Sequence, residues 1–255
     1  MVRTVFRNNK IDAVFHLAGR IEVGLSAKDP TKFWEINVGG TLIVLDAMKN
    51  NGCDTIFFSS TAGVYFCGNI PVPEDECTTD NSVYSNTKLA CERAIEDSGL
   101  NYVIFRYFNL AGADNEMGEN HDPETHLIPS ILRNLNNVEI FGNDYRTPDG
   151  TCVRDYVHVL DVVDAHMAAL NLPNMKCELI NLGSGIGYSN LEIVETIEKI
   201  TGEKVNYKIG PRREGDPDFL VANIDLAKEL LNYEPKHGIE SIIKTAYAWE
   251  KKRTS

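Results

Sequence analysis

The chain has 255 residues, of which 43% are hydrophobic and 24% charged, a composition typical of globular proteins with a sizeable core. A formal net charge of −12 argues against nucleic acids and anionic membrane surfaces as the main partners. The six cysteines form no Cys-x-x-Cys pair and the six histidines show no His-Glu-x-x-His or comparable spacing, so we expect reduced thiols in the cytoplasm and no metal site.

Strand and helix patterns alternate along the first half of the chain: helix 1–10, strand 12–18, helix 29–50, strand 55–60, helix 83–98 and strand 102–106. This alternation predicts a parallel sheet covered by helices on both faces. The helix at 29–50 begins with Asp29 as the capping residue and Pro30 at the first position. Gly39 and Gly40 lower its helix propensity by roughly 1 kcal/mol each relative to alanine, a cost that a close-packed neighbour would offset.

The second half continues with helices at 126–136, 161–170, 225–231 and 238–251 and strands at 138–141, 153–159, 177–182 and 204–209. Gly183-Ser-Gly185-Ile-Gly187 invites interpretation as a dinucleotide loop. Its spacing is GxGxG, however, and no acidic residue closes the next strand to bind a ribose, so we do not predict a dinucleotide site there. Ser189-x-x-Glu192 instead predicts a capping box that starts a helix.

Ligands of open parallel sheets bind outside the carboxyl ends of the strands. Three predicted strands end at Ala18-Gly19, Ser59-Ser60-Thr61 and Tyr107-Phe108-Asn109. We expect these three ends to converge on one crevice.

Tyr84 and Lys88 are four residues apart and share one face of the predicted helix. A phenol normally loses its proton near pH 10, and a neighbouring ammonium together with an oxidised nicotinamide would bring that pKa toward neutrality. A hydroxyl from Thr61 or Ser60 would orient a substrate alcohol, which predicts a general base for alcohol oxidation. The YxxxK spacing by itself is weak evidence and is more often that of an ordinary, half-exposed helix face.

Arginine side chains bind oxyanions well, and Arg154 and Arg213 are candidates to clamp a phosphate on this acidic chain. Surface ion pairs explain both residues equally well from the sequence.

Ten motifs carry a resemblance that runs almost from end to end: His16-Leu-Ala-Gly19, Asn37-Val-Gly-Gly-Thr41, Ser59-Ser-Thr-Ala-Gly-Val-Tyr65, Tyr84-x-x-x-Lys88, Arg106-Tyr-Phe-Asn109, His126-Leu-Ile-Pro129, Ile140-Phe-Gly-Asn-Asp-Tyr145, Asp149-Gly-Thr-Cys-Val-Arg-Asp-Tyr-Val-His158, Asn181-Leu-Gly-Ser-Gly185 and Arg212-Arg-Glu-Gly-Asp216. In content and order they resemble those of the UDP-glucose 4-epimerases, in the extended short-chain dehydrogenase/reductase superfamily. The long block ending at His158 and the loop ending at Asp216 are far more specific than YxxxK.

The resemblance implies an α/β fold, a truncated doubly wound parallel (Rossmann-like) sheet with a smaller C-terminal α/β substrate-binding region. Residues 1–109 with 152–185 would form an incomplete NAD-binding core, and 110–151 with 186–255 the UDP-sugar-binding region.

The implied activity is interconversion of UDP-glucose and UDP-galactose through NAD-dependent oxidation and re-reduction at sugar C4. Tyr84 would be the base, Thr61 would orient the hydroxyl, and Lys88 would hold the nicotinamide ribose and lower the Tyr84 pKa. The 4-keto sugar would swing about its pyrophosphate link and receive the hydride on its other face.

Two sets of contacts are also implied. The cofactor set is Leu17, Ala18, Gly19, Arg20, Ile21, Asn37, Ser59, Tyr84, Lys88 and Phe108. The substrate set is Thr61, Asn109, Leu127, Phe141, Arg154, Arg213 and Asp216, with Phe141 against uracil. Some relatives have lysine at the position of Ile21, where Arg20 would substitute, and Leu220 leaves open whether N-acetylated sugars are accepted.

Family members begin with a strand, a GxxGxxG phosphate loop and an acidic residue for the adenosine ribose, none of which this chain contains. Two βα units and a strand, roughly 60–70 residues, would be missing. The chain would then be either a fragment of an enzyme or a short protein with impaired NAD binding, and its activity stays open.

Two other functions compete with this one. Related 4,6-dehydratases place an Asp-Glu pair after the Ser/Thr, where this chain has Ala62 and Gly63, so dehydration lacks its acid and base. A non-catalytic UDP-sugar-binding module would retain the nucleotide loops without the cofactor half. The family is commonly homodimeric, which implies contacts through the helices at 29–50 and 83–98.

Overall fold

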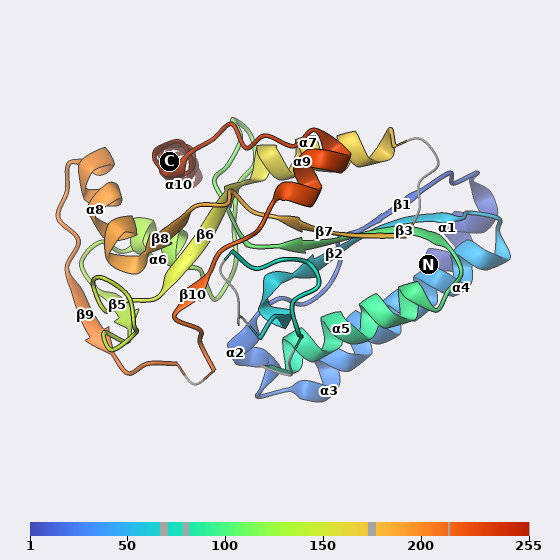
Figure 1. The fold of residues 1–255 in the computed structure, drawn as a ribbon, viewed down its shortest axis with the longest axis horizontal. Helices are drawn as coiled ribbons and strands as arrows, with labels where there is room; N and C mark the ends of the chain where they lie inside the picture. Colours follow the sequence, from blue (N-terminus) through green and yellow to red (C-terminus); the bar gives the residue numbers. More distant parts are fainter. Residues whose placement is uncertain (67–70, 79–81, 173–176, 214, 255) are drawn as a thin grey trace. The chain divides into compact units, whose positions relative to one another are not determined.

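The computed structural model describes residues 1–66, 71–78, 82–172, 177–213 and 215–254 (Figure 1). Contacts divide the chain into two compact units. Unit 1 comprises Met1–Phe66, Glu74–Tyr107 and Ala169–Asn181, and unit 2 comprises Cys67–Pro73, Phe108–Ala168 and Leu182–Ser255.

The sheet of unit 1 has the strand order β1-β2-β3-β7, with β1 at Val14–His16, β2 at Thr55–Thr61, β3 at Asn101–Tyr107 and β7 at Glu178–Leu182. The pairs β1–β2 and β2–β3 are parallel, as the sequence predicted. His16 lies opposite Phe58 and Thr61 lies opposite Tyr107, so the carboxyl ends of these strands lie at the same edge of the sheet.

The helices of unit 1 are α1 (Val2–Asn8), α2 (Val23–Ser26), α3 (Pro30–Phe33), the π-helix η1 (Trp34–Gly39), α4 (Gly40–Asn50), the 3-10 turn η2 (Ala62–Val64) and α5 (Val83–Glu96). The run from α3 to α4 lies beside α5 (Figure 1). Their inward faces bury a core that includes Met48, Ile56, Ile95 and Ile104.

The predicted helix at 29–50 is continuous but contains the π-helix η1 in its middle. Asp29 caps it as expected, accepting a hydrogen bond of 3.3 Å from the Lys32 backbone. The close-packed neighbour that would offset the cost of Gly39 and Gly40 is not found, because no heavy atom of the described residues beyond the adjoining helix backbone lies within 4 Å of a Cβ built at either glycine.

Unit 2 contains the sheet order β10-β6-β4, with β8 on β6, and a separate pair β5–β9. These strands are β4 (Asn109–Ala111), β5 (Val138–Phe141), β6 (Val153–His158), β8 (Gly187–Ser189), β9 (Tyr207–Gly210) and β10 (Phe219–Leu220). The helices α6 (Leu127–Arg133), α8 (Asn190–Thr201) and α10 (Ile239–Arg253) pack together over a core that includes Ile128, Ile193 and Ile242. The remaining helices are α7 (Val159–Leu170), which crosses the unit boundary, and α9 (Asp225–Leu231).

Residues 152–168, predicted from the sequence to belong to the cofactor core, lie in unit 2 by their contacts. The reason is strand pairing, because β6 pairs with β4, β8 and β10 of the same unit. The functional division into an NAD-binding and a UDP-sugar-binding region stays a prediction.

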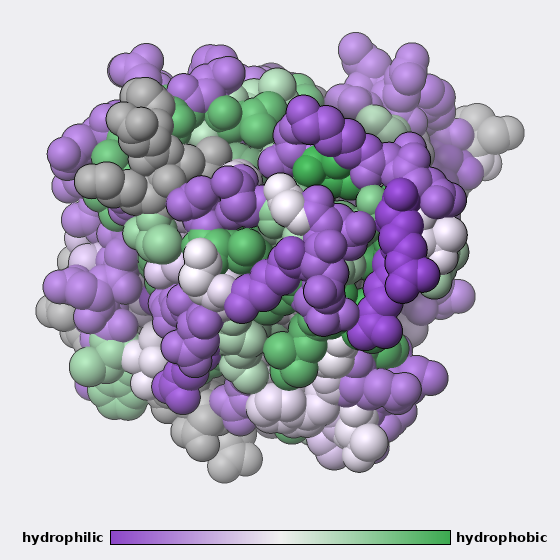
Figure 2. Space-filling model, turned by 90° about the vertical axis from the view of Figure 1, so that its right-hand side faces the viewer, coloured by the Kyte–Doolittle hydropathy of each residue, from purple (hydrophilic) through white to green (hydrophobic). Residues whose placement is uncertain are grey.

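The long predicted elements are confirmed to within a few residues, and the capping box of Ser189 and Glu192 is present. The elements α2, β4, β8 and β10 were not predicted, because two to four residues are too few to show a period. No helix in the described part of the chain is long and apolar enough to cross a membrane. On the face drawn in Figure 2, polar side chains surround smaller apolar patches.

Candidate active site

The helix α5 places Tyr84 and Lys88 beside the carboxyl end of β2. Lys88 is 4% exposed, and its Nζ donates a hydrogen bond of 2.7 Å to the carbonyl oxygen of Ser59. The same Nζ lies 4.8 Å from the centre of the Phe58 ring and 6.0 Å from the centre of the Tyr84 ring. The first turn of α5 is held by Ser26, whose Oγ accepts a hydrogen bond of 3.2 Å from the Tyr84 backbone.

Both ionisable groups are shifted toward their neutral forms. Burial raises the pKa of Tyr84 to about 12, against the opposing effect of a hydrogen bond with the Thr61 side chain. Burial also lowers the pKa of Lys88 to about 8. In the chain itself the Tyr84 pKa therefore shifts in the direction opposite to the expected one, because desolvation outweighs the hydrogen bond with Thr61.

The structure distinguishes the two candidate hydroxyls at the end of β2. The Ser60 hydroxyl donates to Glu92, and that carboxylate is clamped by Arg106 through hydrogen bonds of 3.1 Å and 2.7 Å. Ser60 thus belongs to a buried ionic network. The half-buried Thr61 accepts a hydrogen bond of 3.1 Å from the Gly63 backbone and adjoins the Tyr84 phenol, so it is the better candidate to orient an alcohol.

The turn from Leu17 to Ile21, which follows β1, is tied to Asn37. The Asn37 Oδ1 accepts a hydrogen bond of 2.7 Å from the Arg20 backbone, and its Nδ2 donates to the Arg20 carbonyl and to Thr87, both at 3.0 Å. Asn37 is only 3% exposed. Asn37 donates both of its amide protons to groups of the chain itself. These hydrogen bonds are suited to holding the turn in position.

A Cβ at Gly19 would lie 3.1 Å from the Asn37 Oδ1, a tight contact that the Asn37 side chain could relieve only by shifting. Leu17, Ala18 and Gly19 are exposed at the end of β1. The Arg20 guanidinium lies 3.5 Å from the Glu22 carboxylate and 5.1 Å from the centre of the Phe33 ring.

Two further predicted cofactor contacts, Ser59 and Phe108, are buried like Asn37 and Lys88. Ser59 is 6% exposed, and its hydroxyl donates to the His16 carbonyl at 3.3 Å. Phe108 is 4% exposed, and its backbone N–H donates to the Leu182 carbonyl at 3.0 Å. Both Phe108 and Leu182 belong to unit 2, so Phe108 is held in place from within that unit.

Four of the predicted nucleotide contacts form two pairs in unit 2. Arg154, on β6, is 8% exposed, and its Nη2 lies 3.4 Å from the Asp216 Oδ1. That Nη2 is buried and has no hydrogen-bond partner among the described residues. The Arg213 guanidinium lies 4.1 Å from the centre of the Phe141 ring. A buried guanidinium with an unused donor and an arginine over an aromatic ring are suited to a phosphate and a flat base.

The other two nucleotide candidates lie on the two elements that the loop from β4 to α6 connects. Asn109 is the first residue of β4, opposite Tyr156 of β6, and Leu127 begins α6 and packs against the core of unit 2. The loop that carries Arg213 includes Glu214, which lies outside the described residues.

The rejected GxGxG segment has a structural role within unit 2. The buried Asp155 carboxylate accepts hydrogen bonds from the backbone of Ser184 (2.7 Å), Gly185 (2.9 Å) and Ala222 (3.1 Å). A Cβ at Gly183 would lie 2.5 Å from the Asp155 Oδ2. The glycine therefore allows the loop to wrap around a carboxylate of the chain itself.

Sequence reasoning missed one cluster of chemically active side chains. Glu119, His121, Glu124 and His126 place four potential metal-ligand atoms within 4.8 Å of one another. The signal was present as the spacing Glu-x-His-x-x-Glu-x-His, which matches none of the common metal-binding motifs.

Known proteins resemble this chain over nearly its whole length. Residues 1–183 match the NAD dependent epimerase/dehydratase family. The UDP-glucose 4-epimerase of Lactobacillus helveticus is 43% identical over 265 residues, an alignment that covers 98% of this chain and 80% of the relative.

Solved structures agree with this match. The UDP-glucose 4-epimerase of Bifidobacterium longum, in complex with NAD+ and UDP, superposes with a TM-score of 0.94 at 33% identity, covering 99% of this chain and 80% of that one. The enzyme of Brucella ovis, in complex with NAD, gives a TM-score of 0.91 at 40% identity, with coverages of 96% and 80%. The α/β fold and the resemblance predicted from the motifs are confirmed. The chain belongs to the UDP-glucose 4-epimerases of the NAD dependent epimerase/dehydratase family.

Proposed function

We propose that this chain interconverts UDP-glucose and UDP-galactose, using NAD as its cofactor. The observation that carries the proposal is the group formed by Thr61, Tyr84 and Lys88 at the carboxyl end of β2. The relatives that are similar over almost the whole chain are UDP-glucose 4-epimerases, which supports the same activity.

The residues at this edge of the sheet fit the nicotinamide end of NAD. The Lys88 ammonium is buried yet donates a hydrogen bond only to Ser59 among the contacts described, so two of its three protons remain for ribose hydroxyls. Ala18 and Gly19 are small and exposed, which permits close approach of a ligand to the backbone. We propose that Lys88 and the turn from Leu17 to Ile21 hold the cofactor. Asn37 would hold that turn rather than contact the cofactor through its amide.

When bound, NAD accepts a hydride from the sugar carbon and returns it, and its oxidised ring carries a positive charge. Tyr84 removes the proton of the 4-hydroxyl and later gives it back, while the Thr61 hydroxyl orients the same oxygen. Because burial raises the Tyr84 pKa to about 12, the phenol stays protonated until a further positive charge lies close to it. Tyr84 would therefore remove the proton only when the positively charged cofactor is bound beside it.

Nucleotide recognition would fall to unit 2. Arg154 offers a buried donor to the diphosphate, with Asp216 holding its guanidinium. Phe141 offers its ring to uracil, and the Arg213 guanidinium that now lies on it would be available to a phosphate oxygen. Asn109 and Leu127 complete the proposed substrate contacts.

We also propose a homodimer in the cytoplasm. Four apolar side chains along the run from η1 to α4, Trp34, Ile36, Leu42 and Ile43, are 38–51% exposed, which suits an interface. The cysteines of the described residues are all free, as reduced thiols would be. Sedimentation equilibrium of the purified chain would detect the dimer, and a monomer at all concentrations would refute it.

The activity is tested by turnover of UDP-galactose by the purified protein with and without added NAD, together with the NAD released on denaturation. Tyr84→Phe should lower kcat by about 10²–10⁴-fold, the usual contribution of a general base. Tyr207→Phe, which changes an exposed tyrosine on β9, is the matched control and should leave kcat unchanged.

A folded protein that binds UDP, carries no NAD and stays inactive when NAD is supplied would sink the proposal. It would then be a nucleotide-sugar-binding module. Equal kcat values for Tyr84→Phe and the unaltered chain would reject Tyr84 as the base while leaving the activity in place.

A further inference from the structure

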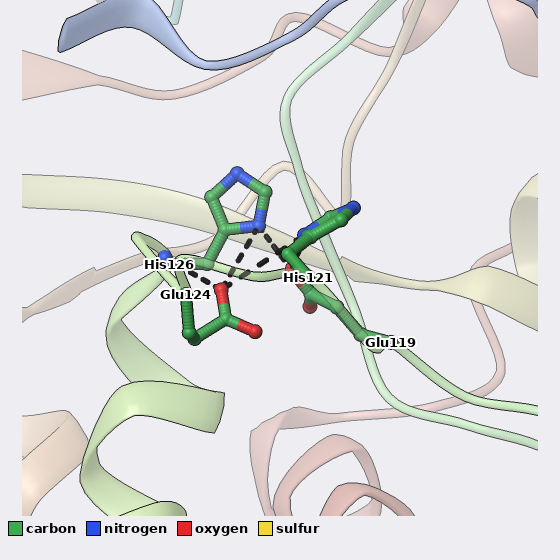
Figure 3. A group of neighbouring side chains, drawn as sticks. All are labelled: Glu119, His121, Glu124 and His126. Atoms are coloured by element: carbon green, nitrogen blue, oxygen red, sulfur yellow. Dashed lines mark hydrogen bonds and ion pairs between the residues drawn. The ribbon is translucent and has the colours of Figure 1, made fainter. Parts of the chain in front are cut away.

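The loop between β4 and α6 gathers two histidines and two glutamates whose side chains point toward one another (Figure 3). We call them the 119–126 cluster, which consists of Glu119, His121, Glu124 and His126. None of these residues belongs to the proposed catalytic or nucleotide-binding set. The cluster lies within unit 2.

The distances within the cluster are those of a nearly formed coordination shell. The His121 Nδ1 lies 3.0 Å from the Glu119 Oε1 and 3.9 Å from the Glu124 Oε1. The His126 Nδ1 lies 4.0 Å from the same Glu124 oxygen and contacts the Glu119 Oε1 directly. Ligands about 2.0–2.2 Å from a tetrahedral zinc ion are roughly 3.4 Å apart, so small movements would close the shell.

The loop is held in this arrangement from outside the cluster. Arg133 of α6 lies 3.0 Å from the outer oxygen of Glu124 and donates to the carbonyl oxygens of His121 (2.9 Å) and Glu119 (3.3 Å). The Trp249 indole donates to the Glu119 carbonyl at 3.0 Å. The inner oxygen of Glu124 is oriented by the backbone N–H of His126 at 3.0 Å. Such outer partners orient ligands at metal sites and strengthen them.

Burial and exposure also suit a metal site. The Glu124 side chain is 7% exposed and that of Glu119 is 18% exposed, so both carboxylates are largely shielded from water. The two imidazoles are 38% and 48% exposed, which leaves an entry path for an ion. Two carboxylates and two neutral imidazoles give the ligands a charge that matches a divalent ion.

We propose that the 119–126 cluster binds one Zn²⁺ ion per chain. Zinc binds imidazole nitrogens and carboxylate oxygens, and its structural sites are tetrahedral with four ligands, as this cluster provides. The ion would be structural, because it would tie the loop after β4 to the start of α6. The proposal does not depend on the proposed function, since its test measures metal binding and not turnover.

The competing explanation needs no metal. A protonated His126 beside Glu119 would bind both carboxylates as a charged hydrogen-bond network, and the hydrogen bond to Glu119 raises the pKa of His126. Zinc binding at neutral pH distinguishes the two, because the ion must displace the proton.

The test uses the full chain without a histidine tag, stripped with a chelator and then titrated with Zn²⁺ by calorimetry. Metal content after dialysis gives the stoichiometry. We expect one zinc per chain, and we expect His126→Ala and Glu119→Gln each to weaken binding by about a hundredfold or more, since even an outer-shell change costs about 10–100-fold. Glu116→Gln, an exposed glutamate of the same loop, is the matched control and should bind as the unaltered chain does.

A second measurement keeps the proposal testable if one of the variants folds poorly. Co²⁺ in place of Zn²⁺ should give the visible absorption of a tetrahedral site in the unaltered chain and in Glu116→Gln, and none in His121→Ala. A chain that retains no zinc overturns the proposal, as does one whose zinc affinity is the same in all the cluster variants. In either case the charged network is the better description.

Discussion

His16, at the end of β1, is a buried histidine that the proposed chemistry does not use. It is 8% exposed, and its Nε2 lies 2.9 Å from the Thr41 Oγ1. When Thr41 donates its only proton to the Asn37 carbonyl at 2.7 Å, the His16 ring nitrogen is the donor in their hydrogen bond. Burial, and then the positive charge of Lys88, lower the pKa of His16 to about 4.

His16 should make the chain sensitive to acid. Its folded pKa lies below the unfolded value of about 6.5, so the unfolded chain binds more protons between pH 6.5 and 4. The stability it confers is complete above pH 6.5 and is lost as the pH falls toward 4. A shift of this size corresponds to about 3 kcal/mol.

Urea unfolding of the unaltered chain and of His16→Gln at several pH values measures this loss. The variant should be less stable at pH 7 but should lose about 3 kcal/mol less on going from pH 6.5 to 4. Parallel stability profiles for the two proteins would show that His16 is not the responsible group.

Two glycines show how packing around an element decides the effect of one added methyl group. A Cβ at Gly183, after β7, would lie 2.5 Å from the Asp155 Oδ2 and 2.6 Å from the Ala222 Cβ. A Cβ at Gly40, the first residue of α4, would have no heavy atom of the described residues within 4 Å beyond the adjoining helix backbone. The first position lacks room for alanine, whereas the second has open space.

We therefore expect opposite effects of alanine at these two sites. Gly183→Ala should lower the free energy of unfolding by about 1–3 kcal/mol, the usual cost of overpacking. Gly40→Ala should raise it by up to about 1 kcal/mol, because alanine is the better helix former. Chemical denaturation of both variants measures the two changes. The prediction applies to the single chain at concentrations below those of the proposed dimer, which would cover α4. Destabilisation of the monomer by Gly40→Ala would contradict it.

Local patterns in the sequence predicted the long elements and placed Thr61, Tyr84 and Lys88 together. Short stretches of sequence are enough to predict where parallel strands end and which residues share one face of a helix. The role of Asn37 could not be predicted in the same way, because it depends on the π-helix η1 and on contacts with Arg20.

Long-range contacts explain the other failures. The Ser60 hydroxyl donates its hydrogen bond to Glu92, which lies 32 residues further along the chain. The raised pKa of Tyr84 depends on burial, and the hydrophobic periodicity of the sequence indicates burial only approximately. Arg154 and Arg213 were phosphate candidates from their residue type, and the other nucleotide candidates came from the resemblance to a family. The way Arg213 lies over Phe141 is visible only in the structure.

At the scale of the whole molecule, the proposed roles divide between the two compact units. Thr61, Tyr84, Lys88 and the turn from Leu17 to Ile21 lie in unit 1. The proposed nucleotide contacts all lie in unit 2: Asn109, Leu127, Phe141, Arg154, Arg213 and Asp216. Each unit has its own buried core, so each can respond to its own ligand.

Amide hydrogen exchange can test this division by comparing the free chain with the chain saturated with UDP. UDP carries no hexose and no nicotinamide, so it should slow exchange around Phe141, Arg154 and Arg213 and leave α5 unchanged. Binding stabilises only the state that holds the ligand, by RT ln(1 + [L]/Kd), or about 2.7 kcal/mol at a hundredfold excess over Kd. Equal protection of α5 by UDP would contradict the division, since the helix that carries Tyr84 would then respond to the nucleotide alone.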